Sequence, residues 1–201
     1  MISLCTISCN AEYLNRMLSI VRPYVGEAIV VYGNKEHQDV VRIAQSFNCK
    51  VFYREFDNDF AEQRNFSIQK SNGDWIFVLD DDEVPSFDLL GYIYNVDENK
   101  IDDFDLLKIY FKDYYRFQNN SYFHLNANYR FYKKILNFKY RNMVHEEIDL
   151  KEYPNIRVFE LPIEDGIIYH EKTIEKQSVS NKLYEKISLN GKKIIKQSIK
   201  R

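Results

Sequence analysis

The sequence has few cysteines, no long apolar run and no strong excess of charge of either sign. No segment contains the roughly 18 apolar residues that a membrane-spanning helix needs, and no basic region precedes the first apolar stretch. We therefore expect a cytoplasmic protein without a signal peptide. The formal net charge of −2 gives no whole-molecule basis for binding nucleic acid.

The three cysteines, Cys5, Cys9 and Cys49, form a poor set for a disulfide or a zinc site. Cys5 and Cys9 would lie about 13 Å apart along one strand, which is too far for a disulfide, given a rise of about 3.3 Å per residue. The sequence therefore predicts buried, reduced thiols.

Repeats, linkers and low-complexity segments are also absent from the sequence. The chain has 201 residues, 45% of them hydrophobic and 29% charged, which suits one compact α/β unit. We expect a domain over residues 1–170 and a basic helical extension over 171–201, packed on that domain or trailing it.

The first half of the chain alternates strand and helix patterns, which is typical of a parallel sheet. Asn10 is a candidate N-cap, and Leu14, Met17, Leu18 and Val21 follow it at helical spacing. The expected strands are 2–8, 27–32, 50–53, 75–79 and 103–112, the further helices are 35–47, 60–70 and 87–96, and an antiparallel strand or hairpin is expected within 114–140.

The apolar run 75–79 is followed directly by four acids, Asp80 to Glu83. A run of this kind suits a strand buried on both faces, and ligands of open α/β sheets bind beyond the carboxyl ends of the strands. Asp80 and Asp82 are two residues apart and project to one side, so the pair suits Mg²⁺ or Mn²⁺ with substrate phosphates completing the shell. The alternative is a charged turn that caps a helix beginning at Pro85.

Three clusters around this strand resemble family-2 glycosyltransferases of the GT-A fold, in the branch with RNF, GDW-x-x-x-LDxDE and VHE motifs. The clusters are Asp59-Phe60, Arg64-Asn65-Phe66 and the segment Gly73-Asp74-Trp75 with Leu79-Asp80-Asp81-Asp82-Glu83. The resemblance implies a Rossmann-like three-layer α/β/α sandwich with a mainly parallel central sheet and a small antiparallel extension. It also implies a metal-dependent, inverting, hexosyltransferase-like enzyme of class EC 2.4 that uses a nucleotide diphosphate-sugar, with a UDP-sugar favoured.

In that family the two outer aspartates of the motif hold a metal that bridges the donor diphosphate. The resemblance implies this role for Asp80 and Asp82, with Mn²⁺ or Mg²⁺ as the ion. His170 ends a short apolar strand and is a candidate third ligand, because family members often supply a histidine from this part of the chain. The alternative for His170 is a structural histidine.

The resemblance extends to the rest of the donor site with one departure. Arg64 is a candidate to pair with the donor phosphates or to hold the aspartates in place, and Asn65 and Asp81 adjoin the same site. The family's base-binding aspartate has no counterpart in residues 31–36, where only a glycine and a glutamate match. Tyr32 either stacks on the base in its place or simply ends a strand.

Residues 141–147 resemble the VHE element that lines the acceptor pocket. An inverting transfer needs a base for the acceptor proton, and Glu146 is our candidate, with His145 orienting it or contacting phosphate. Glu147 is the rival base, and an exposed strand end with solvated acids is the alternative interpretation. Aromatic candidates for an acceptor platform, which more commonly serve as core, are Tyr114, Tyr115, Phe117 and Tyr122.

Residues 182–201 carry seven basic residues against one acid. This end is a candidate for peripheral contact with the inner face of a membrane or with nucleic acid, and a solvated helix is the alternative. The acceptor class stays open between a glycan, a lipid-linked or a macromolecular acceptor. Two other functions also stay open: an inactive relative that binds a glycan or partner, and a different metal-dependent enzyme that processes nucleotides.

Overall fold

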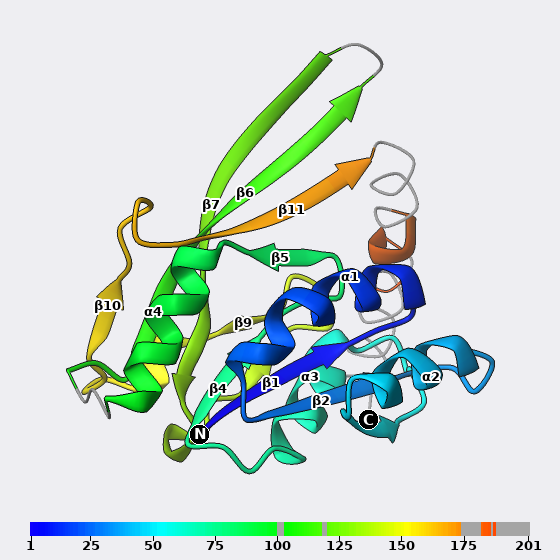
Figure 1. Ribbon diagram of the computed structural model, residues 1–201, viewed down its shortest axis with the longest axis horizontal. Helices are drawn as coiled ribbons and strands as arrows, with labels where there is room; N and C mark the ends of the chain where they lie inside the picture. The colour runs from blue at the N-terminus through cyan, green and yellow to red at the C-terminus, as the bar shows by residue number, and fades with distance from the viewer. Residues whose placement is uncertain (100–102, 118–119, 174–181, 186, 188–201) are drawn as a thin grey trace, which may run out of the picture.

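The computed structural model describes residues 1–99, 103–117, 120–173, 182–185 and 187 (Figure 1). Its centre is a nine-stranded sheet in the order β3-β2-β1-β4-β7-β6-β11-β5, with β10 beside β6, and a separate hairpin joins β8 to β9. The strands are β1 Ile2–Ile7, β2 Glu27–Tyr32, β3 Lys50–Tyr53, β4 Trp75–Val78, β5 Glu83–Pro85, β6 Leu106–Phe117, β7 Asn120–Lys133, β8 Tyr140–Arg141, β9 Glu147–Ile148, β10 Val158–Glu160 and β11 Ile167–Thr173.

The sheet combines a parallel half with antiparallel strands. β1 pairs in parallel with β2 and β4, and β2 pairs in parallel with β3. The order then changes, because β7 runs antiparallel to both β4 and β6, while β11 runs parallel to β6 and antiparallel to β5. The expected mainly parallel sheet with an antiparallel extension is confirmed.

The helices begin where polar side chains cap them. Asn10 accepts from the backbone N–H groups of Glu12 and Tyr13, and Asp59 accepts from that of Glu62. Ser86 caps the fourth helix, and Pro85 belongs to β5, so the alternative in which a helix begins at Pro85 is wrong. The helices are α1 Ala11–Val21, α2 Gln38–Ser46, α3 Phe60–Gln69 and α4 Phe87–Glu98, with 3₁₀ turns η1 Arg22–Tyr24, η2 Lys134–Leu136 and η3 Leu150–Glu152.

Apolar side chains fill both faces of the sheet, which makes the three layers. Leu4 of β1 points into a cluster with the apolar faces of α1, α2 and α4, and its neighbour Cys5 points into a second cluster that includes Ala61 of α3. This alternation follows from the two-residue period of a strand. Leu14, Met17, Leu18 and Val21 of α1 are fully buried as expected, and each such side chain stabilises the fold by about 1.5–3 kcal/mol relative to exposure.

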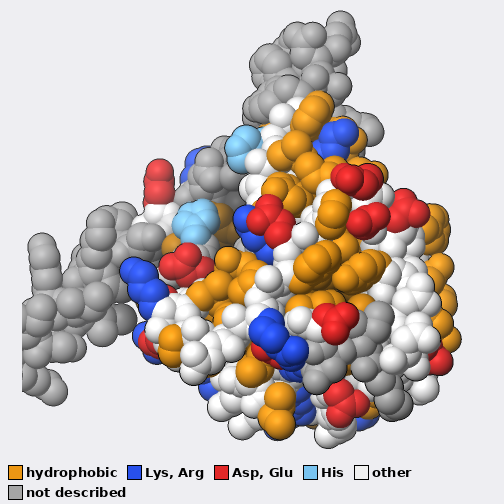
Figure 2. All heavy atoms as spheres, turned by 90° about the vertical axis from the view of Figure 1, so that its left-hand side faces the viewer, with side chains coloured by type: hydrophobic (Ala, Val, Ile, Leu, Met, Phe, Trp, Pro, Cys, Tyr) orange, Lys and Arg blue, Asp and Glu red, His pale blue; other side chains and the backbone are white. Residues whose placement is uncertain are grey.

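The outer parts of β6 and β7 extend well beyond the body as a twisted ribbon, with β11 alongside (Figure 1). We call this ribbon the arm and define it as residues 108–117 and 120–129. The pattern in the sequence predicted a strand that ended at residue 112, and β6 continues to Phe117 because its pairing with β7 runs along the whole length. Hydrophobic side chains also reach the surface on the side of α4 and β10, as Figure 2 shows.

Two expectations about the first 50 residues are corrected by the structure. β1 ends at Ile7, so Cys9 lies in the loop before α1 and is exposed, whereas Cys5 is buried and Cys49 is half-buried. The prediction of a buried thiol at Cys9 is therefore wrong. The second helix begins at Gln38 and not at residue 35, because the segment before it forms a turn that includes a hydrogen bond from the His37 N–H to the Asn34 carbonyl.

The C-terminal expectations fall largely outside the part of the chain that the structure describes. β11 runs through Thr173, past the boundary expected at residue 170. Residues 174–181, 186 and 188–201, which carry most of the expected basic extension, lie outside the described residues. Within the described ranges, no helix combines the length and apolar character needed to cross a membrane.

Candidate functional site

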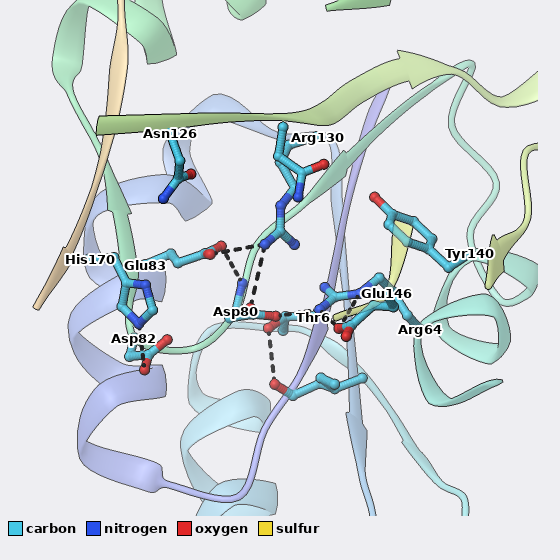
Figure 3. Close-up of polar contacts among 12 residues, drawn as sticks. Thr6, Arg64, Asp80, Asp82, Glu83, Asn126, Arg130, Tyr140, Glu146 and His170 are labelled. Atoms are coloured by element: carbon cyan, nitrogen blue, oxygen red, sulfur yellow. Dashed lines mark hydrogen bonds and ion pairs between the residues drawn. The ribbon is translucent and has the colours of Figure 1, made fainter. Parts of the chain in front are cut away.

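The acidic end of β4 meets side chains from α3 and from the segment before β9 (Figure 3). Arg64 of α3 donates from Nη2 to Asp80 Oδ1 at 2.8 Å, and the same Nη2 binds Glu146 Oε1. The Arg64 side chain is only 3% exposed, and its guanidinium lies over the ring of Tyr140 at 5.3 Å from the ring centroid. The structure therefore brings three of the expected site residues into one buried ion-pair cluster.

A second arginine, Arg130 of β7, joins this cluster and was not anticipated from the sequence. Its Nη2 lies 3.0 Å from Glu83 Oε1 and 3.5 Å from Asp80 Oδ2. Glu83 in turn accepts from the Asp80 backbone N–H at 2.8 Å. A charged residue within the otherwise aromatic run Tyr129 to Tyr132 was the available signal. Arg130 and Glu83 together fix both the backbone and the side chain of Asp80.

Charge balance in the cluster rests on the two guanidinium groups. Burial alone would raise the pKa of Asp80, but Arg64 and Arg130 hold it well below its usual range. Burial raises the pKa of Glu83 to about 7 despite its contact with Arg130. Arg64 Nη1 and Arg130 Nε are buried and have no partner among the described residues. Buried donors of this kind usually bind a water molecule or an anion, although in this structure both atoms are closed off from solvent.

Asp82 faces a different partner, His170 of β11 (Figure 3). His170 Nε2 lies 3.2 Å from Asp82 Oδ2, and His170 Nδ1 lies 3.1 Å from Asp113 Oδ1. Asn126 Nδ2 donates to the other oxygen of Asp113 at 2.8 Å. Burial alone would lower the pKa of His170, but its bonds with Asp113 and Asp82 raise it to about 10. In this state His170 is an imidazolium held between two carboxylates.

The Asp82–His170 pair fits a divalent ion. Two neighbouring ligands of an octahedral ion with bonds of about 2.1 Å are about 3 Å apart, close to the 3.2 Å between the Asp82 oxygen and the His170 nitrogen. Among the described residues no group of three His, Cys, Asp or Glu side chains is arranged as a complete metal site. An incomplete protein shell is the usual arrangement where substrate phosphates supply the remaining ligands.

Asp81 points away from both of these groups and towards the start of α1. Its Oδ2 accepts from the Ser8 hydroxyl at 2.7 Å and from the backbone N–H groups of Cys9 and Asn10 at 3.3 Å. Burial raises the pKa of Asp81 to about 6, against the effect of the Ser8 hydrogen bond. Asp81 thus anchors the loop between β1 and α1 at the edge of the site.

Two other expected donor-site residues have partners within the protein. Asn65 binds the backbone of Tyr140 from both ends of its amide, with Nδ2 donating to the carbonyl at 3.0 Å and Oδ1 accepting from the N–H at 2.9 Å. Tyr32 ends β2, is half-buried, and lies 5.4 Å from the ring of Tyr53, centroid to centroid. Asn65 therefore positions the strand before the VHE element, and Tyr32 keeps one side at the surface.

The VHE element separates its two glutamates. Glu146 points to Arg64 and its side chain is 14% exposed. Glu147 is exposed and accepts from Asn142 Nδ2 at 3.3 Å. The backbone of His145 is left-handed, with φ of 55°, and its exposed ring meets that of Tyr184 at 5.1 Å between centroids. Of the two glutamates, Glu146 is the one that the structure places beside Asp80.

The aromatic candidates of the arm lie on both of its faces. Asp113 and His170 face the acidic cluster, and side chains alternate along a strand, so the neighbouring Tyr114 and Tyr169 point to the opposite face. There the two rings stack with centroids 6.2 Å apart. Tyr115 is half-buried. The side chains of Phe117 and Tyr122 lie outside the described part of the structure.

Comparison with known proteins gives the family. The sequence model of glycosyl transferase family 2 matches residues 3–159. The chain belongs to glycosyl transferase family 2. A TPR repeat-containing protein from Synechococcus elongatus is 38% identical over 84 residues, which are 41% of this chain and 20% of that protein.

Solved structures share the fold of this chain. TarS 1–349 from S. aureus in complex with UDP-GlcNAc matches with a TM-score of 0.60 and 15% identity, over 85% of this chain and 58% of that one. The structure of S. aureus TarS matches with a TM-score of 0.59 and 16% identity, over 94% of this chain and 39% of that one. The chain thus has the GT-A, Rossmann-like fold, and it spans only part of the length of these relatives.

Proposed function

We propose that the chain is a metal-dependent, inverting glycosyltransferase of class EC 2.4 that moves a sugar from a nucleotide diphosphate-sugar to an acceptor hydroxyl. The observation that carries the proposal is the Asp82–His170 pair beyond the carboxyl end of the buried strand β4, near two buried arginines that each have an N–H group without a partner in the described part of the chain. Ligands of open α/β sheets bind at this end of the strands. Membership of glycosyl transferase family 2 supports the reaction type, and the complex of S. aureus TarS with UDP-GlcNAc supports a UDP-sugar as donor.

Asp82 and His170 hold the Mn²⁺ or Mg²⁺ ion in this proposal. Such an ion supplies electrostatic stabilisation of the charge that develops on the leaving diphosphate. Asp80, the other expected ligand, is held by Arg64 at 2.8 Å and by Arg130 at 3.5 Å, and it would become a ligand only if it moved towards the ion, because among the described residues no three such side chains form a complete site. Mg²⁺-type ions commonly take one or two protein carboxylates, so the donor phosphates would supply ligands that the protein does not.

Arg64 and Arg130 bind the diphosphate in this proposal through Arg64 Nη1 and Arg130 Nε, which have no partner among the described residues. Both side chains are nearly fully buried, at 3% and 9% exposure, so each charge acts in a medium of low dielectric. Their positions are fixed before the donor binds, because Asp80 contacts both guanidinium groups. Preorganised cations of this kind stabilise a leaving group without reorganisation during the reaction.

Glu146 takes the proton of the acceptor hydroxyl. As the acceptor oxygen forms its bond to the anomeric carbon, the bond from that carbon to the diphosphate breaks on the opposite face, and the hydroxyl proton moves to the Glu146 carboxylate. The ion pair with Arg64 places Glu146 beside Asp80, whereas Glu147 is exposed and turned to Asn142. His145 borders the same segment and contacts Tyr184.

Donor turnover tests the proposal. The chain is incubated with Mn²⁺ or Mg²⁺ and a panel of UDP-, GDP- and CMP-sugars, and nucleotide release is followed. We expect a nucleoside diphosphate from one donor, loss of this release in Asp82→Ala, and a fall of about 10²-fold or more in Glu146→Gln. Glu147→Gln is the matched control and is expected to stay close to the unmodified chain.

Other results would favour the other functions. Release of a nucleoside monophosphate from a UDP- or GDP-sugar would identify a different nucleotide-processing enzyme, whereas a CMP-sugar releases CMP in ordinary glycosyl transfer. If no nucleotide is released and calorimetry detects no donor binding, the chain is a binding module and not an enzyme. The sequence feature that agrees with this outcome is the missing base-binding aspartate in residues 31–36. An equal loss in Glu146→Gln and Glu147→Gln would remove the assignment of Glu146 as the base.

A further inference from the structure

Behind His170 lies a hydrogen-bonded chain of side chains from the two strands of the arm, which runs from the buried Asp113 to Asn126 at the surface. Asp113 of β6 is 3% exposed and binds His170 Nδ1 at 3.1 Å. Asn126 of β7 binds the other Asp113 oxygen at 2.8 Å. We infer that Asp113 and Asn126 are positioning residues that orient the His170 ring for a divalent cation shared with Asp82. The inference rests on the proposed function, because it assumes that His170 is a metal ligand.

The hydrogen bond between Asp113 and His170 determines which nitrogen of the His170 ring can bind the ion. A carboxylate oxygen only accepts hydrogen bonds, so the Asp113 contact places an N–H on His170 Nδ1. Nε2, which faces Asp82 across 3.2 Å, is then the nitrogen that binds a cation, and the cation displaces the Nε2 proton to solvent. Metal-binding histidines usually donate their second N–H to such a carboxylate, which fixes the tautomer and the ring orientation.

Asn126 determines how Asp113 itself is oriented. Its amide donates from Nδ2, so one Asp113 oxygen is occupied by Asn126 and the other is directed at the His170 ring. The register supports this geometry, because His170 pairs with Asp113 across β11 and β6, and Asp113 pairs with His124 across β6 and β7. Asn126 is two residues from His124 and so lies on the same face of the sheet.

A purely structural role explains the arrangement less well. Burying a carboxylate costs free energy unless it is paired, and replacing a buried ion pair by apolar residues is often neutral or stabilising. The adjacent strand positions already show apolar packing, since Phe111 of β6 is 3% exposed beneath the guanidinium of Arg130. The arm strands therefore contribute to the metal site and are more than a platform for the acceptor.

The test is a titration of the whole chain with Mn²⁺, without donor, in which free Mn²⁺ is measured by electron paramagnetic resonance. We expect Asp113→Asn to weaken Mn²⁺ binding by about 10–100-fold, the range typical for outer-shell partners. Asn126→Ala removes one hydrogen bond and is expected to weaken binding by about fivefold. His124→Gln, which removes an exposed histidine from the same face, is the control and should leave the affinity unchanged.

A second measurement separates orientation from folding. The ¹⁵N resonances of the His170 ring, recorded with Mg²⁺, should report Nδ1 as the protonated nitrogen in the unmodified chain and a mixture of tautomers in Asp113→Asn. The thermal unfolding midpoint of each variant shows whether it is folded. Asp113→Ala is the harsher variant, and Asp113→Asn keeps the size of the side chain if the alanine variant does not fold.

The outcomes distinguish this inference from the proposed function. Mn²⁺ binding that is lost in Asp82→Ala but unchanged in Asp113→Asn would overturn the positioning role alone. Absence of Mn²⁺ binding in the unmodified chain, or binding that survives Asp82→Ala and His170→Ala, would overturn the proposed metal site and the inference with it.

Discussion

Replacing Arg64 with methionine should destabilise the fold and show how the acidic cluster is held. Arg64 is the buried cation shared by Asp80 and Glu146. Removing one partner of a buried ion pair costs about 3–5 kcal/mol, because a charge stays buried without compensation. The Asp80 side chain is 31% exposed and still has Arg130 at 3.5 Å, so we expect the lower end, about 3 kcal/mol.

The coupling free energy between Arg64 and Glu146 is a second quantity that can be measured. Glu146→Gln removes one of the two charges that Arg64 balances, so the double variant Arg64→Met/Glu146→Gln should lose less than the sum of the single losses. Residues in one ion-pair network typically show coupling of about 0.5–3 kcal/mol, and we expect at least 1 kcal/mol. Burial alone would raise the pKa of Asp80, but Arg64 is the main group that lowers it. The stabilisation from this ionised carboxylate is therefore present above its ordinary pKa and is lost as the pH falls below it.

Urea unfolding at neutral pH, followed by circular dichroism, measures these free energies. We compare the unmodified chain, the two single variants and the double variant. The comparison requires that all four show the same slope of the free energy of unfolding against urea concentration. Arg141→Met is the control, because Arg141 pairs with Glu152 at the surface, where the side chains are 55% and 38% exposed. That substitution should cost less than about 1 kcal/mol. The reasoning is refuted if Arg64→Met costs no more than Arg141→Met, or if the losses are additive.

The remaining predictions concern stability elsewhere in the fold. Gly73→Ala should destabilise by about 1–3 kcal/mol, because a Cβ there would lie 2.6 Å from the carbonyl oxygen of Met1. Gly91→Ala, in the middle of α4 with open space around a Cβ, should instead stabilise by about 0.5–1 kcal/mol, and chemical denaturation of the two variants should show opposite signs. Burial alone would raise the pKa of Glu27, but hydrogen bonds from Lys50 and Ser3 lower it from 4.5 to about 2. Stability should therefore fall by up to about 3 kcal/mol as the pH drops from 4.5 to 2, and Glu27→Gln should flatten that dependence in thermal unfolding.

The parallel half of the fold could be predicted because its signals are local. β2 and β3 begin and end at the residues expected from their patterns, α1 follows the predicted capping residue Asn10, and α3 and α4 begin at the expected residues 60 and 87. Each of these signals lies within a few residues of the element that it predicts. The full length of the arm could not be predicted, because its strands are stabilised by the pairing of β6 with β7. Aromatic and polar residues occur on both faces of these strands, so the sequence shows no alternating pattern that marks where they end.

The candidate site was predictable only in part for the same reason. The acids 80–83 and the segment Arg64-Asn65 stand out as motifs, and the structure brings Arg64, Asp80 and Glu146 together. Arg130, Asp113 and Asn126 carry no motif. Their contacts arise from the register of β7, β6 and β11, which places residues far apart in the chain side by side.

The sequence by itself determined that a buried strand ends in three consecutive aspartates at the ligand-binding edge of a sheet. Tertiary structure alone decided the partner of each: Asp80 faces the two arginines, Asp81 the loop before α1, and Asp82 His170. The physical reason is that the chain does not stay extended as expected but turns over residues 80–83, where the Glu83 N–H donates to the Asp80 carbonyl at 3.1 Å, so that the three carboxylates point in different directions. Each carboxylate then meets whichever donor another element supplies there, and those donors come from α3, β7, the loop after β1, and β11.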